Sequence, residues 1–445
     1  MQKPLRDGLI LRTLSEGHAA DRDQLPDFIE QTFGTAFDDP AFAKTLGVWQ
    51  RDLLHGHPTV TDDDVFVVVD PAKDDLLVSA TTLIPQTWQY EAISFGVGRP
   101  ELVATHPDYR RRGLVRAVLD ALHERSRASG HLLQVIYGIE HFYRQFGYSM
   151  ALDITSALQV PLASAAPLKE GTLPRYTLRT AAEDDLPAIA SWTNDYARAL
   201  LISVARTHDE WRYEMFGISS GHSYHKQYFI ILDTDGRGVG YVALRSMTFS
   251  GALFVTSYVV GDDASYLDTF SDVMRELRQI TLDFRDAAGG GAPPHLALFQ
   301  SGLHPTLDTL IKRQLGGALR DNRYAWYVRI ADLPAFMRRV ASVMETRLHG
   351  SGAHNWTGTL TVGLFARERL ALQFERGSLS DARMEPETGE NDCDFPYQMF
   401  VNVVLGHHNV SEIRAILPDT SFNGRSEALL GILFPKGRSW IVAQA

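Results

Sequence analysis

The sequence has almost no cysteine. Cys393 is the single cysteine of the 445 residues, so the chain can form neither an internal disulfide nor a zinc site built from several cysteines. Such usage is typical of a reducing compartment, and we expect a cytoplasmic protein. The opening residues, MQKPLRDGLILRT, have no long apolar core and no small-residue cleavage site, so they predict no signal peptide.

Long apolar runs and an excess of basic residues are also missing. No run of about 18 apolar residues occurs, so we expect no membrane-spanning helix. Lysine and arginine number 43 against 54 aspartate and glutamate residues, a net charge of −11, whereas general nucleic-acid binders are basic. The chain therefore predicts neither a membrane protein nor a nucleic-acid-binding protein. Its acidity is compatible with a cationic substrate.

What is present is an ordinary globular composition. Hydrophobic residues make up 44% and charged residues 22% of the chain, as in soluble domains, and the length suffices for about three domains. Strand and helix patterns alternate through two regions and continue into a third. We predict an α/β (α+β) protein with a first region at 1–160, a second at 161–331 and a third at 332–445.

The first region carries the clearest strand and helix signals. Short runs rich in valine, leucine and isoleucine predict strands at VFVVVD (65–70), LLVSATTLIP (76–85), LVAT (102–105) and HLLQVIYG (131–138). Between the last two, a helix is expected from about Arg112 to Ser129, with Gly130 as its C-terminal cap.

The opening of the second region resembles that of the first. YTLRTAAEDDLPAIASW (176–192) and LILRTLSEGHAADRDQLPDFI (9–29) both contain a strand with Leu-Arg-Thr, a polar segment and an acidic helix start. We interpret this similarity as a weak internal repeat. Chance similarity between short segments is the alternative.

The segment LVATHPDYRRRGLVRAVL (102–119) predicts an anion-binding site. A strand ends at Thr105, a turn follows, and three arginines and Gly113 lead into a helix. Free N–H groups and the helix dipole favour negative charge at a helix start, and a glycine lets a phosphate approach the backbone. Arginines add charge-assisted hydrogen bonds. The pattern suits a pyrophosphate, and the alternative is a solvated basic helix start.

This segment resembles the acetyl-CoA-binding motif of the GNAT N-acetyltransferases, Gln/Arg-x-x-Gly-x-Gly/Ala. The motif falls on Arg110, Gly113 and Val115, with valine in place of the small third residue. The resemblance implies that acetyl-CoA is the co-substrate and that the preceding strand pairs with its pantetheine arm. The residues that it assigns to this binding are Val103, Ala104, Thr105, Arg110, Arg111, Arg112, Gly113, Leu114 and Val115.

The segment EHFYRQFGYSMA (140–151) carries a second part of the resemblance. GNAT enzymes have Phe/Leu-Tyr-x-x-x-Gly-Phe/Tyr here, and Tyr143 matches the tyrosine that lies near the CoA sulfur. The resemblance implies that its phenol protonates the leaving thiolate as a general acid. An aromatic core residue is the alternative for Tyr143, and core packing is the prediction for its neighbours Phe142, Phe146 and Tyr148.

Length, repeat and domain order together resemble the Eis-type acetyltransferases. This resemblance implies a catalytic GNAT domain in the first region, a GNAT-like domain without cofactor in the second, and a sterol-carrier-protein-like domain in the third. The second region has FVTSYVVGDDASYLDTF (254–270), in which Asp262 and Asp263 would repel a pyrophosphate. The resemblance also implies a homo-oligomer, a hexamer, and gives the α-carboxylate of the last residue, Ala445, the role of general base.

The predicted reaction is direct transfer of an acetyl group to a primary amine of a small cationic acceptor, such as an aminoglycoside or a polyamine. Asp38 and Asp39 are the candidate residues for holding such a cation, and a solvated loop is the alternative for them. No metal is predicted, because His407-His408 has no third ligand spaced nearby.

Smaller expectations concern two further residues, and other functions stay open. His123 is expected on an exposed helix face, and Cys393 in a polar loop without a role. The alternatives to the predicted enzyme are a non-catalytic acyl-CoA-binding sensor, a lipid carrier that uses the third region, and a protein or peptide N-acetyltransferase.

Overall fold

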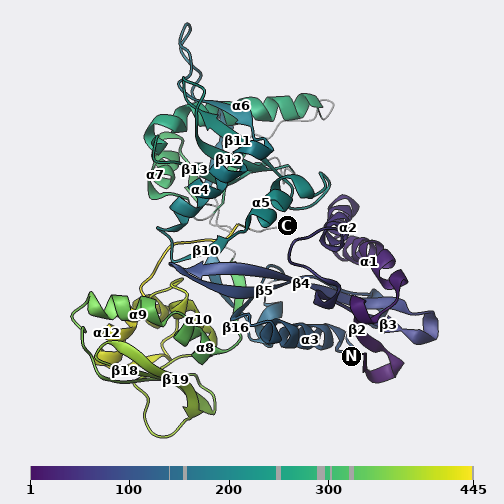
Figure 1. The fold of residues 1–445 in the computed structure, drawn as a ribbon, viewed down its shortest axis with the longest axis vertical. Coiled ribbons are helices and arrows are strands. Elements are labelled where there is room, and N and C mark those ends of the chain that lie inside the picture. Colours follow the sequence, from purple (N-terminus) through teal and green to yellow (C-terminus); the bar gives the residue numbers. More distant parts are fainter. Residues whose placement is uncertain are drawn as a thin grey trace.

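The computed structural model describes residues 2–139, 141–153, 158–246, 252–287, 296–300, 303–319 and 325–442. These residues form three sheets with helices packed against them (Figure 1). This mixed architecture confirms the predicted fold class. None of the described helices is long and apolar enough to cross a bilayer. Ala445, the predicted general base, lies outside the described residues.

The first sheet contains the strands that the sequence predicts. VFVVVD forms β3 (Val65–Asp70), which pairs antiparallel with a longer strand β4 (Leu76–Tyr90). In order of pairing, the strands are β1 (Lys3–Pro4), β2 (Ile10–Thr13), β3, β4, β5 (Ile93–Thr105), β6 (Leu133–Ile136), β16 (Ala325–Ile330) and β7 (Ser149–Asp153). Two strands lie off this order, β10 (Ile202–Ala205) beside β4 and β22 (Ser439–Trp440) beside β10.

Helices cover both faces of this sheet. α1 (Ala19–Phe37) and α2 (Pro40–Leu54) lie on one face and α3 (Leu114–Ala128) on the other (Figure 1). Successive side chains of a strand point to opposite faces, so Val67 packs under α1 and α2, whereas Val68 packs under α3. Burial on both faces explains the unbroken apolar run of β3.

The second sheet repeats much of this arrangement. Its strands pair in the order β15 (Ala318–Leu319), β8 (Leu158–Pro161), β14 (Leu296–Phe299), β13 (Ala252–Val260), β12 (Gly238–Arg245), β11 (Lys226–Leu232) and β9 (Thr177–Thr180). The helices of this region are α4 (Leu186–Ala197), α5 (His208–Arg212), α6 (Tyr266–Ala287) and α7 (Pro305–Gln314). The parallel pair β13–β14 corresponds to the parallel pair β5–β6 of the first sheet.

The internal repeat also has a shared ion pair. Arg12 of the first Leu-Arg-Thr donates two hydrogen bonds of 2.9 Å to Asp21. Arg179 of the second donates two of the same length to Asp185. Each aspartate also accepts a hydrogen bond from the backbone N–H three residues earlier, as a helix-start residue does. The two similar sequence segments thus make the same local structure.

The two sheets exchange a strand. β16 comes from the end of the second region but lies in the first sheet, where it pairs antiparallel with both β6 and β7. β8 begins at Leu158 and lies in the second sheet, antiparallel to β14 and β15. β16 therefore completes the first sheet although it follows the second sheet in the chain, whereas β8 lies at the boundary between the first two regions and joins the sheet that follows it.

The third region packs a third sheet and five helices against the first sheet. Its strands pair in the order β19 (Ser378–Pro386), β18 (Glu368–Glu375), β17 (Gly358–Gly363), β20 (Cys393–Asp394) and β21 (Ser421–Phe422). Its helices are α8 (Leu333–Arg339), α9 (Ala341–His349), α10 (Tyr397–Val404), α11 (Val410–Ile416) and α12 (Gly424–Leu433). One hydrophobic core joins this region to Trp88 and Tyr90 of β4.

The expectation of a polar loop around Cys393 is wrong. Cys393 lies in β20, parallel to β17, and its side chain is buried in the core shared with the first sheet. Burial raises the pKa of its thiol far above the ordinary value. The polar residues around it hid this position in the sequence, because only Cys393 and Phe395 of the segment are buried in that core.

Candidate active site

The site begins where two neighbouring strands part. β5 pairs with β6 only at Val97–Leu133 and Gly98–Gln134. β5 continues to Thr105, so its later residues have no ladder partner on the β6 side among the described residues. Backbone N–H and C=O groups without partners are suited to pair with an extended ligand. The predicted pantetheine-binding residues Val103, Ala104 and Thr105 lie in this part of β5.

A bulge interrupts β5 just before its last residues. The register with β4 shifts between Ala80 and Thr82, and Leu102 takes a left-handed φ of 53°. Such strain at a bulge is common beside functional sites. Beyond the bulge the side chains alternate as in any strand, so Val103 packs on the α3 face, whereas Leu102 and Ala104 pack under α1 and α2. The end of β5 therefore contributes side chains to both faces of the sheet.

The predicted anion site lies at the start of α3. Tyr109 anchors the preceding turn, because its buried hydroxyl donates a hydrogen bond of 2.6 Å to Asp70. Gly113 is the N-terminal residue of the helix, with a left-handed φ of 78° and no side-chain cap. The first N–H groups of α3 therefore lack helical partners. An added Cβ at Gly113 would meet no atom within 4 Å, so the backbone is open to a ligand.

The three arginines of this site differ in their surroundings. Arg112 lies over the Tyr109 ring at 4.7 Å and forms an ion pair of 3.8 Å with Asp7. The side chains of Arg110 and Arg111 make no hydrogen bond or ion pair with another described residue, and both residues are exposed. Arg110 and Arg111 are therefore the arginines whose charge is available to an anion.

Tyr143 lies on the same face as the start of α3. It belongs to a short 3₁₀ helix, Phe142–Phe146, and is buried in a cluster with Tyr148 and Tyr327. Val103 and Val115 pack against this cluster. The structure thus brings together the predicted acid, the end of β5 and the first turn of α3. Core packing of Phe142, Phe146 and Tyr148 is confirmed.

The opposite face of β5 carries an acid that the sequence interpretation missed. Glu101 is 5% exposed, and its Oε1 accepts a hydrogen bond of 2.7 Å from Nε of Arg99, which is fully buried. Burial raises the pKa of Glu101 above its ordinary value, although the Arg99 charge opposes this shift. A buried ion pair in the strand that forms the site is a signal of function.

Aromatic rings from three parts of the chain surround this ion pair. The guanidinium of Arg99 lies 5.6 Å from the ring of Trp49, 5.3 Å from that of Tyr224 and 5.1 Å from that of Trp326. Trp49 belongs to α2, Tyr224 precedes β11, and Trp326 lies in the exchanged strand β16. The second region and the exchanged strand thus complete this face of the site.

Other sequence-predicted residues lie elsewhere. Asp38 and Asp39 are exposed in the turn between α1 and α2, where Asp39 caps α2 by accepting a hydrogen bond of 3.0 Å from the backbone N–H of Phe42. The expectation that His123 is exposed is wrong. Its ring is buried, and its Nε2 lies 2.7 Å from the hydroxyl oxygen of Tyr148. Burial lowers the pKa of His123 to about 3.

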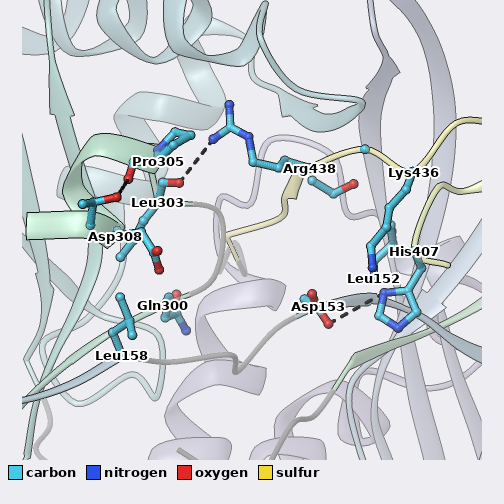
Figure 2. Close-up of a pocket in the computed structure, with 13 residues that line it drawn as sticks. Leu152, Asp153, Leu158, Gln300, Leu303, Pro305, Asp308, His407, Lys436 and Arg438 are labelled. Atoms are coloured by element: carbon cyan, nitrogen blue, oxygen red, sulfur yellow. Dashed lines mark hydrogen bonds and ion pairs between the residues drawn. The ribbon is translucent and has the colours of Figure 1, made fainter. Parts of the chain in front are cut away.

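A cavity of about 420 Å³ lies apart from this site, between β7, α7 and the segment before β22. Figure 2 shows Asp153 beside His407, at 3.7 Å, and Arg438 donating a hydrogen bond of 3.2 Å to the carbonyl of Leu303. Burial lowers the pKa of His407 to about 4, so its ring is neutral at neutral pH. In the described part of the chain, no group of three His, Cys, Asp or Glu side chains is arranged to hold a metal ion.

A larger groove lies beside α3, next to the predicted anion site. It has a volume of about 1240 Å³ and runs from Arg116, in the first turn of α3, to the third region. Arg329, Arg338 and Arg367 also line it, together with Asp120 and other polar residues. This groove offers an open, largely basic surface next to the start of α3.

Comparisons with known proteins agree with this geometry. Residues 18–151 match the family described as "Acetyltransferase (GNAT) domain". No curated protein matches the chain. Many solved structures share its fold, and three of them are described below. A conserved protein of Enterococcus faecalis V583, described as a probable N-acyltransferase, has a TM-score of 0.68 at 12% identity, covering 98% of this chain and 100% of its own.

The other two structures are similar to the same extent. A GCN5-related N-acetyltransferase of Kribbella flavida has a TM-score of 0.62 at 17% identity, and Eis1 of Mycobacterium abscessus has 0.61 at 14%. Each covers 98% of this chain and 100% of its own. Identities this low establish the fold alone. The family match, which includes the end of β5, the start of α3 and Tyr143, shows that residues 18–151 are a GNAT acetyltransferase domain.

Proposed function

We propose that the protein is an N-acetyltransferase that moves the acetyl group of acetyl-CoA directly to a primary amine. The observation that carries this proposal is the convergence of three features: the unpaired end of β5, the uncapped start of α3 and the buried Tyr143. The first two supply backbone groups for the pantetheine and the pyrophosphate, and Arg110 and Arg111 add positive charge. Acetyl-CoA, when bound, supplies the activated acyl group.

Residues of this chain then handle the protons. A carboxylate accepts a proton from the attacking amine, whose nitrogen forms a bond to the acyl carbon as the bond to sulfur breaks. A backbone N–H near Val103 polarises the thioester carbonyl. The hydroxyl of Tyr143 gives its proton to the departing sulfur. No covalent intermediate on the enzyme is needed, which agrees with the buried, high-pKa state of the single cysteine.

Two carboxylates are candidates for the base. One is the α-carboxylate of Ala445, which the resemblance to Eis-type enzymes implies. The other is Glu101, whose burial supports a pKa closer to neutrality and therefore a stronger base. The amine is expected to reach the face of β5 that carries Glu101. A small cationic acceptor of the aminoglycoside or polyamine kind follows from the resemblance, with Asp38 and Asp39 as its exposed contacts.

We also propose the Eis-type arrangement of the three regions, with a sterol-carrier-protein-like third domain and a hexameric assembly in the cytoplasm. Support for a degenerate second GNAT-like domain comes from its parallel pair β13–β14 and from a register shift in β13 like that in β5. The exposed Asp262 and Asp263 precede its helix α6, where arginines precede α3. Such a domain would not bind CoA.

Calorimetric titration with acetyl-CoA tests the proposal. We expect one site per chain, and replacing Arg110 and Arg111 together by alanine should weaken binding by about tenfold or more, because two charge-assisted contacts are lost. Arg237→Ala is the matched control, since Arg237 is an exposed arginine of the second region. Binding that is absent, or that is unchanged in the double variant, would contradict the proposed cofactor site.

Lengthening the chain tests the terminal carboxylate. If Ala445 supplies the base, two glycines added after it should lower kcat by about 100-fold or more, because the base moves away from the amine. The steady-state rate at saturating acetyl-CoA measures this effect. Two glycines added before Met1 provide the control. Full activity of the C-terminally lengthened chain would remove the terminal carboxylate from the mechanism and leave Glu101 as the base.

A further inference from the structure

Polar atoms without hydrogen-bond partners gather beside Arg99 and Glu101. Among the described residues, five buried side-chain atoms around this ion pair lack a hydrogen-bond partner: Trp49 Nε1, Gln50 Nε2, His222 Nε2, Ser223 Oγ and Trp326 Nε1. All five residues are less than 5% exposed. A buried polar group without a partner lowers the stability of a protein, so five in one place indicate a site that a ligand completes.

Aromatic rings and Arg99 connect three of the side chains that carry these atoms, those of Trp49, His222 and Trp326. The ring centroid of Trp49 lies 4.8 Å from that of Tyr224 and 5.7 Å from that of His222. Trp326 reaches the same cluster through Arg99, which lies over its ring. Gln50 joins it through Thr82, because Thr82 is the register partner of Glu101. Ser223 lies between His222 and Tyr224 in the chain, so the five residues gather around the Arg99–Glu101 ion pair and come from both sheets and the segments beside them.

The atoms are nearly all hydrogen-bond donors. An indole nitrogen can only donate, which settles Trp49 and Trp326. The backbone N–H of Tyr224 donates to Nδ1 of His222 at 2.8 Å, so the proton of the neutral ring is on Nε2. Gln50 uses its oxygen to accept from Thr82 at 3.1 Å, which leaves its amide nitrogen as a donor. The hydroxyl of Ser223 can donate as well.

Positive charge also exceeds negative charge here. Arg245 lies over the ring of Tyr224 at 4.6 Å and donates a hydrogen bond of 3.0 Å to the carbonyl of Ser223. Arg99 and Arg245 thus both lie over Tyr224, and the carboxylate of Glu101 pairs with Arg99. Burial keeps His222 uncharged, with a pKa of about 3. A ligand that satisfies this site therefore has several hydrogen-bond acceptors and a negative charge.

We propose that this donor cluster binds the carboxylate of the acetyl acceptor, so that the acceptor is an amine of the amino-acid type rather than a polycation. The inference rests on the proposed function, because it names the acceptor of the same site. The rings of Trp49, Tyr224 and Trp326 add an apolar, aromatic lining for the rest of the acceptor. Tyr137, which contacts Trp326 at 6.1 Å and is 43% exposed, lies at the rim.

A panel of acceptors tests the proposal on the full chain. Each of a set of amino acids is compared with its own amide and with the amine that lacks the carboxyl group, and kcat/KM for acetylation is measured. We expect at least one acid to exceed both of its analogues by about tenfold or more, because a site built for a polar group rejects analogues without it. Equal or better use of the amides, or of polyamines, would overturn the proposal and leave the acetyltransferase function standing.

Two variants connect the preference to the cluster. Arg245→Gln should abolish the preference for the acid, and Trp49→Phe, which keeps a ring but removes its N–H, should reduce kcat/KM for the acid by about tenfold while sparing the amide. Trp356→Phe, a tryptophan of the third region, is the matched control. A preference that survives both variants would show that the carboxylate binds elsewhere.

Binding measurements separate this proposal from the proposed function. Calorimetry with the same panel in the presence of CoA detects the acceptor without any transfer. An amino acid that binds and is not acetylated would support carboxylate binding by the donor cluster and contradict the proposed acetyltransferase function. If no amino acid binds, the proposed carboxylate site is overturned.

The α-carboxylate of Ala445 has the same chemistry as the proposed ligand, so the panel is repeated with the chain lengthened by two glycines. If the lengthened chain still prefers amino acids to their amides, this supports the substrate as the source of the bound carboxylate. If the preference is lost, the assignment of the cluster to the substrate is overturned.

Discussion

Replacing Glu101 by glutamine should lower kcat/KM for acetyl transfer by about 100-fold or more, because the variant keeps the shape of the side chain but loses the base. Glutamine can still accept a hydrogen bond from Arg99, so the buried pair is not left wholly without a contact. The acidic limb of the pH profile should change too. The base works when deprotonated, so activity rises with pH through its raised pKa, and this rise should disappear in Glu101→Gln.

The matched control is Glu214→Gln. Glu214 is another buried glutamate in an ion pair, with Lys226, but it belongs to the second region. Both variants leave a buried cation without its charged partner, a change that destabilises proteins by about 3–5 kcal/mol at most. Thermal unfolding should show comparable losses, whereas only Glu101→Gln should lose activity. Equal activities of the two variants would leave Ala445 as the base.

Tyr143→Phe should lower kcat by at least about tenfold while the affinity for acetyl-CoA stays unchanged, because the departing thiolate loses its general acid. The ring of Tyr143 packs against Tyr148 and Tyr327, and phenylalanine preserves this packing. Steady-state rates with a good acceptor and calorimetry with CoA measure the two quantities separately. A thiol leaving group of lower pKa should restore part of the rate, because it needs less protonation.

Tyr148→Phe serves as the control for this variant. Tyr148 lies in the same cluster, and its hydroxyl makes a buried contact of 2.7 Å with His123. Removing that hydroxyl should cost stability of about 1 kcal/mol and leave acetyl transfer unchanged. If Tyr143→Phe behaves in the same way, its hydroxyl is structural and the thiolate leaves without an acid from the protein.

Local sequence patterns were sufficient for much of the first sheet. The apolar run Val65–Asp70 is buried on both faces, and the helix after the arginines begins at Leu114, within two residues of the prediction. Gly130 follows that helix with a left-handed φ of 78°, as a glycine cap does. These features depend on neighbours in the chain, so a short window of sequence contains their cause.

The second face of the site depends on distant residues and was not predicted. A single glutamate in an apolar strand indicates an exposed position, yet Glu101 is buried because Arg99 and rings from α2, β16 and the segment before β11 enclose it. His123 was misjudged for a related reason. Its helix lies against the sheet, and Tyr148, from a later strand, covers the ring. Only tertiary packing decides such positions.

The place of β16 in the first sheet delays the completion of that sheet during synthesis. β6 and β7 cannot acquire their shared neighbour until Ile330 has been synthesised. At about 5–20 residues per second, the ribosome needs roughly 10–40 s to travel from the end of β6 to β16. Throughout that interval the nascent first sheet exposes two unsatisfied strand edges, which are templates for mispairing with other chains. A gene fragment that stops at residue 160 lacks β16, so its first sheet would keep these strand edges exposed permanently.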